Sequence, residues 1–96
     1  MSDHRTVNDY VSEIELHEDK LLECVIPNGT MMHIAAVAVG PHPHTTLKYV
    51  VYSTGFPEPT IIDRDGVEDR VKRCQPDVQV IDYEHSLFAL DSGGSQ

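Results

Sequence analysis

The spacing of apolar residues near the N-terminus predicts a helix. Apolar side chains recur at i, i+3, i+4 and i+7, the spacing that puts them on one face of a 3.6-residue helix, at Val7, Tyr10, Val11 and Ile14. Thr6 precedes this run, and its hydroxyl is well suited to cap the first turn, with Asp9 three residues on. We therefore expect a helix from Thr6 to about Leu16.

The pattern of residues 15–26 leaves two interpretations open. Leu21 and Val25 continue the seven-residue spacing, which favours a single helix that runs to Cys24. The alternation from Ile14 to His17 and the β-prone residues of 22–26 favour a strand instead. The sequence does not decide between helix and strand here.

Three β-prone runs with short connections predict an antiparallel meander. The sequence Pro27-Asn28-Gly29 is typical of a hairpin turn, because Asn and Gly tolerate the backbone angles that such turns need. The run from Met31 to Val39 is apolar at both alternating sets of positions, so we expect a strand in the middle of the sheet. The segment from Gly40 to His44 interrupts it, and residues 45–54 resume a β-prone composition.

The last third of the chain predicts a short edge strand, a helix and a further strand. Ile61 and Ile62 suit the edge strand. Asp65, followed three residues later by Glu68, predicts a capped helix that starts at Val67. Pro76 ends this helix, and residues 77–83 predict a strand with Val78 and Val80 on one face.

These elements predict an α+β fold. Residues 1–96 form a small single domain, in which an antiparallel β-sheet meander carries one or two helices packed on one face. We expect about 1–5 and 91–96 to be flexible ends. Because helices on one side leave the second face of the apolar strand open, we expect a second copy to cover that face in a homodimer. The alternative cover is the segment Leu87–Leu90.

The charge balance excludes some classes of protein. Sixteen acidic residues against seven basic ones give a net charge of −9, and the one basic cluster (Arg70, Lys72, Arg73) lies among acidic neighbours. Direct nucleic-acid binding is therefore not expected. No apolar run is long enough for a membrane helix, and the polar N-terminus predicts a cytoplasmic protein. In that compartment we expect Cys24 and Cys74 to stay reduced and partly buried.

Histidines provide the candidate metal site. His42 and His44 lie two residues apart, so in an extended segment both imidazoles point the same way, and His33 lies in the preceding strand. Neutral imidazole is a ligand for zinc or nickel. The sequence therefore suggests His33, His42 and His44 as metal ligands.

No pattern assigns a catalytic or cofactor-binding residue. The chain has no nucleophile elbow and no glycine-rich phosphate loop, and Asp82, Glu84 and His85 suit a solvated strand end. The sequence thus favours a small acidic non-enzymatic interaction domain that contacts a protein partner or a second copy. One alternative is a small protein that binds a divalent metal through its histidines. The other is an acidic inhibitor that mimics nucleic acid and binds a basic partner.

Overall fold

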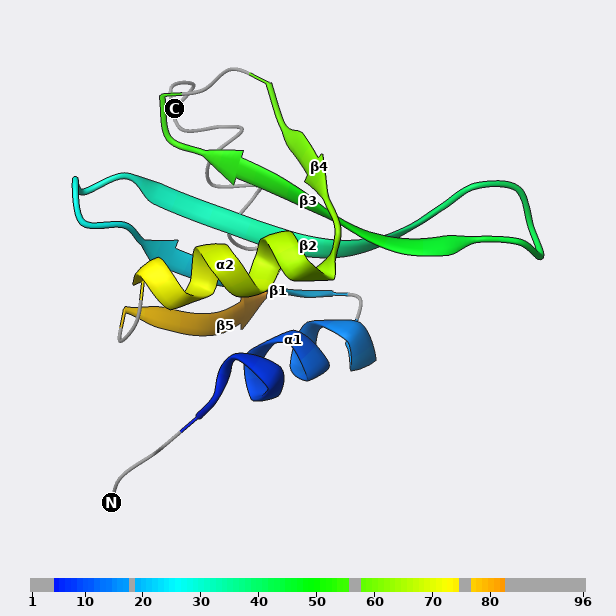
Figure 1. The fold of residues 1–96 in the computed structure, drawn as a ribbon, viewed down its shortest axis with the longest axis horizontal. Helices are drawn as coiled ribbons and strands as arrows, with labels where there is room; N and C mark the ends of the chain where they lie inside the picture. Colours follow the sequence, from blue (N-terminus) through cyan, green and yellow to red (C-terminus); the bar gives the residue numbers. More distant parts are fainter. Residues whose placement is uncertain (1–4, 18, 56–57, 75–76, 83–96) are drawn as a thin grey trace.

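The structure, a computed structural model, describes residues 5–17, 19–55, 58–74 and 77–82 and has the predicted α+β architecture (Figure 1). The elements follow the chain as α1 (Val7–Leu16), β1 (Lys20–Val25), β2 (Met31–Val39), β3 (Thr46–Ser53), β4 (Thr60–Ile62), α2 (Arg64–Cys74) and β5 (Val78–Asp82). Every neighbouring pair of strands is antiparallel, and the order across the sheet is β4-β3-β2-β1-β5. The apolar strand β2 is central, as its composition predicts.

The first helix ends at Leu16 and is followed by a strand, so the longer helix is wrong. A capping box fixes its start: the Thr6 hydroxyl accepts from the Asp9 amide at 3.2 Å, and the Asp9 carboxylate accepts from the Thr6 amide at 2.9 Å. The alternation from Ile14 to His17 does not mark the strand, because Ile14 and Leu16 lie in α1. The strand is β1, in which Leu22 and Cys24, two residues apart, both reach the core on the helical face.

The predicted turn between β1 and β2 is confirmed. Gly29 has a φ of 89°, a left-handed conformation that favours glycine. The Asn28 side-chain oxygen accepts from the Thr30 amide at 2.9 Å, which closes the turn locally.

The second helix begins earlier than predicted, and Asp65 does not cap it. It starts at Arg64, and Asp63 is the cap, because its side chain accepts from the Gly66 amide at 3.1 Å and its carbonyl accepts from the Val67 amide at 3.1 Å. Asp65 lies inside the first turn, where a carboxylate still interacts favourably with the helix dipole.

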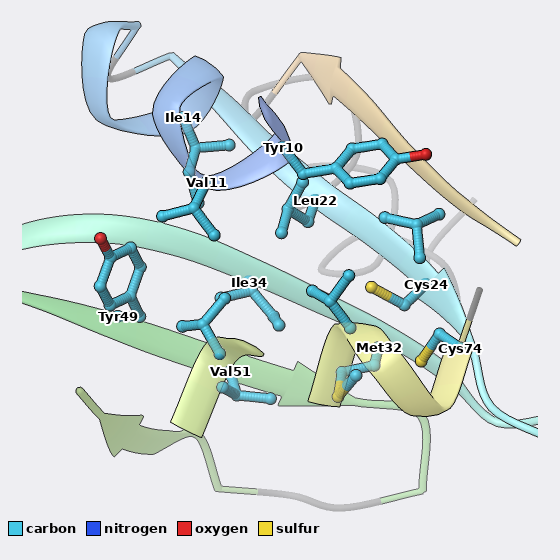
Figure 2. Close-up of a cluster of buried hydrophobic side chains, with 13 residues drawn as sticks. Tyr10, Val11, Ile14, Leu22, Cys24, Met32, Ile34, Tyr49, Val51 and Cys74 are labelled. Atoms are coloured by element: carbon cyan, nitrogen blue, oxygen red, sulfur yellow. The ribbon is translucent and has the colours of Figure 1, made fainter. Parts of the chain in front are cut away.

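Both helices pack on one face of the sheet and enclose the main core (Figure 2). Val11 and Ile14 of α1 and Val71 of α2 are fully buried, and they meet Leu22 of β1 and Ile34 of β2 in one cluster. Neither helix of the described part is long and apolar enough to span a membrane.

A polar network ties the two helices to the sheet. The buried Tyr49 hydroxyl donates to the Glu15 carboxylate at 2.6 Å, and the Arg64 guanidinium donates to the same carboxylate oxygen. Arg64 also donates to the Asn8 side chain and lies 3.5 Å from Glu68. Burial, followed by the bond to Glu15, raises the pKa of Tyr49.

The centre of the second face is also buried. Leu21, His33 and Ala35 point away from the helices, yet each has at most 4% of its surface exposed. The prediction of a homodimer assumed that this face is open. Around these three residues it is not, so this argument for a second copy does not apply there. The segment Leu87–Leu90, the other predicted cover, lies outside the described residues.

Candidate interaction surface

The structure places His33 away from the other two predicted metal ligands. His33 is 3% exposed and lies in the sheet, where its Nε2 is 3.2 Å from a carboxylate oxygen of Glu23. The other oxygen of Glu23 accepts from the Gln79 side chain at 2.8 Å, so the three side chains form a row across β2, β1 and β5. Nδ1 of His33 has no hydrogen-bond partner in this part of the structure.

His42 and His44 lie at the turn between β2 and β3. Val39 lies six residue steps along the extended strand from His33, a distance of about 20 Å, and the turn lies beyond it. The residues that the structure describes contain no group of three His, Cys, Asp or Glu placed to hold a metal ion. Metal binding by His42 and His44 remains a prediction, and His33 lies too far from them to be the third ligand.

The β2–β3 hairpin extends beyond both helices (Figure 1). Ala35 is the last residue of β2 paired with β1, and Tyr49 is the first residue of β3 paired with β4. From Val37 to Lys48 the two strands pair only with each other among the described strands. We call this two-stranded segment, residues 37–48, the arm.

The arm exposes apolar side chains. Leu47 is 44% exposed on the helical face, and Val39 is 42% exposed on the other. Where the arm leaves the body, a hollow of about 350 Å³ lies between it and the end of α1. Its lining is Ile14, Glu15, Ala35, Ala36, Val37, Ala38 and Leu47. The hollow is mostly apolar and accessible from solvent.

The arm lies in the one long part of the chain without acidic residues. All sixteen Asp and Glu residues fall outside residues 24–57, and this stretch contains Lys48 and three histidines. The helices, in contrast, carry acidic residues along their exposed sides, three on α1 and three on α2. The negative charge of the protein is therefore concentrated on the body, and the arm is neutral to weakly basic.

A second concave region lies at the opposite end of the sheet. This groove, of about 570 Å³, runs beside α2 and is lined by Arg70 and Arg73 from the basic cluster, together with Glu58, Asp69 and several hydroxyl groups. Arg73 pairs with Asp69 at 3.0 Å, and Arg70 donates to the Gly66 carbonyl at 3.4 Å. Since two carboxylates balance the two guanidinium groups, the groove has no net charge to attract an anion.

Sequence reasoning selected His33 and missed both its partner and the arm. The tight turn at Asn28-Gly29 fixes the register of β1 against β2, and this register places Glu23 opposite His33. The acid-free stretch is visible in the sequence and marks the arm. Comparisons with protein-family models, curated proteins and solved structures find no match for this chain.

Proposed function

We propose that this protein is a non-enzymatic protein-interaction domain that self-associates through the arm. The observation that carries the proposal is the extension of the arm past both helices, with strand edges that no described strand pairs and with exposed apolar side chains. The partner that we propose is a second copy of the same chain.

The backbone of the arm supports pairing with an identical segment. Each of its two strands has one edge that no strand of the described structure covers, and such an edge presents N–H and C=O groups ready to pair with another extended segment. Two copies related by a two-fold axis bring the same edge together antiparallel, so every hydrogen bond and every side-chain contact occurs twice.

The distribution of charge supports a second copy of the chain as the partner of the arm. Two chains of net charge −9 repel each other, and the repulsion is strongest where helix α1 or α2 faces its copy. The arm is the surface on which two copies approach without bringing carboxylates together. Leu47 and Val39, each exposed by more than 40%, then lose contact with water on association.

The test is a charge placed on the arm. Wild-type protein, kept reduced, should show a mass that approaches twice 10.7 kDa by sedimentation equilibrium as its concentration rises to about 100 µM. Leu47→Glu puts two like charges into the contact, one from each copy, and should weaken dimerisation by at least about tenfold. Circular dichroism checks that the fold is retained.

Ile61→Glu is the matched control. Ile61 is an apolar strand residue with 60% exposure, but it lies on β4 outside the arm, so the substitution adds the same charge elsewhere. We expect Ile61→Glu to dimerise like the wild type. A wild-type chain that stays monomeric throughout, or equal weakening by both substitutions, would overturn the proposal.

A further inference from the structure

The two cysteines of the chain meet although they are far apart in sequence. Cys24 lies near the end of β1, and Cys74 is the last residue of α2. Both are almost fully buried in one core cluster, and their side chains lie close together at the same end of it (Figure 2). The two thiols therefore come from a strand and a helix that are separated in the chain by β2, β3 and β4.

We infer that Cys24 and Cys74 are a redox pair, which closes into one intramolecular disulfide when the protein meets a small-molecule disulfide such as oxidised glutathione. The inference does not depend on the proposed dimer. Both cysteines are free and buried in the structure, as the sequence predicts, and the inference concerns what an oxidant does to this pair.

The reaction is two successive exchanges. The Cys74 thiol loses its proton and attacks the reagent, which releases one reduced molecule and leaves a mixed disulfide on Cys74. The Cys24 thiol then loses its proton and attacks the sulfur of Cys74, and the second reduced molecule leaves. The protein loses two protons and two electrons in total, and the reagent takes up both as two thiols.

The position of Cys74 explains how a buried pair reacts. It is the last residue of α2, and the terminal turn of a helix opens more easily than its middle. Burial raises the pKa of both thiols, which keeps the thiolate fraction low. Exchange should therefore be slow at neutral pH and faster near pH 9.

The disulfide would link β1 covalently to α2 and so stabilise the fold. A disulfide restricts the unfolded chain, and the loop closed here contains about 50 residues, including the arm and β4. The oxidised protein should therefore melt about 10 °C or more above the reduced one.

The experiment incubates the native wild-type protein with oxidised glutathione at pH 8.5 and follows three readouts. We expect an intact mass lower by about 2 Da with no glutathione attached, a loss of both free thiols, and the higher melting temperature. Dithiothreitol added to the same sample should reverse all three, which keeps the test independent of how any variant folds.

Cys24→Ala and Cys74→Ala are the controls for pairing. Each retains one thiol, so each should give only a glutathione adduct or a cross-linked pair of chains. The inference is overturned if the wild type keeps both thiols free or accumulates only adducts. It is equally overturned if the oxidised chain melts at or below the temperature of the reduced chain.

Discussion

Replacing Tyr49 with phenylalanine tests whether the polar network holds the helices on the sheet. Tyr49 is 1% exposed, and its hydroxyl donates to Glu15 at 2.6 Å. The substitution keeps the ring in the core and removes only the hydroxyl. Glu15 keeps its ion pair with Arg64, so the change isolates a single hydrogen bond to a charged acceptor.

The magnitude follows from the exposure of the acceptor. A hydrogen bond to a charged group contributes about 1.5–3 kcal/mol, and the lower end applies here because the Glu15 side chain is 30% exposed and water replaces part of the loss. We therefore expect Tyr49→Phe to lower the free energy of unfolding by about 1.5 kcal/mol. For a domain of this size the melting temperature should fall by about 6–12 °C.

The assay is urea denaturation together with thermal melting, at one protein concentration and under reducing conditions. Tyr52→Phe is the control, since Tyr52 lies on the same strand but is 36% exposed on the other face. It should change stability by less than about 0.5 kcal/mol. Equal effects of the two substitutions would refute the role of the Tyr49 bond.

A second pair of variants tests whether Arg64 and Tyr49 act through the same carboxylate. Both donate to one oxygen of Glu15, so their effects should not add. In an Arg64→Ala background Glu15 has lost its guanidinium, and Tyr49→Phe should then cost at least about 0.5 kcal/mol more than in the wild type. Strict additivity would show that the two contacts are independent.

Three further predictions concern the cap, salt and alkaline pH. Asp63→Ala should cost about 1 kcal/mol in urea denaturation and Asp65→Ala clearly less, because only Asp63 accepts from the Gly66 amide. Screening of a net charge of −9 should raise the melting temperature by about 3 °C or more between low salt and 0.5 M NaCl; a flat or falling profile would contradict this. Burial raises the pKa of Cys24, so its stabilising contribution is present below pH 9 and is lost as the unfolded thiol ionises above it. Urea denaturation should show stability falling more steeply between pH 8 and 10.5 in the wild type than in Cys24→Ala.

Local signals predicted most of the fold correctly, because they involve groups close in sequence. The Thr6 cap and the Asn28-Gly29 turn each depend on atoms within three residues of one another. The start of α2 is the exception. Both Asp63 and Asp65 have a suitable acceptor, and the choice depends on tertiary packing: a Cβ on Gly66 would lie 3.1 Å from Cβ of Ile62, so a glycine lets the first turn sit against β4.

The contacts that define the proposed sites are between distant residues, and periodicity carries no information about them. Nothing in the local pattern around Cys24 indicates that the end of α2 returns to it, and the same holds for Glu15 and Tyr49. The pair of Glu23 and His33 is different, because the turn fixes the register and makes the pairing calculable. The metal hypothesis did not take this register into account, which places His33 opposite Glu23 in the sheet.

The existence of the arm follows from the lengths of β2 and of the helices that cover it. β2 has 9 residues and is about 30 Å long at 3.3 Å per residue, whereas α1 with 10 residues is about 15 Å long. Helices of this length cannot cover such a strand from end to end. The hairpin must therefore project, and its projecting part lies within the stretch from which Asp and Glu are absent. A solvated projection on an acidic protein has no physical need to exclude carboxylates, but a surface that meets an identical copy does, since each carboxylate there would appear twice in the contact.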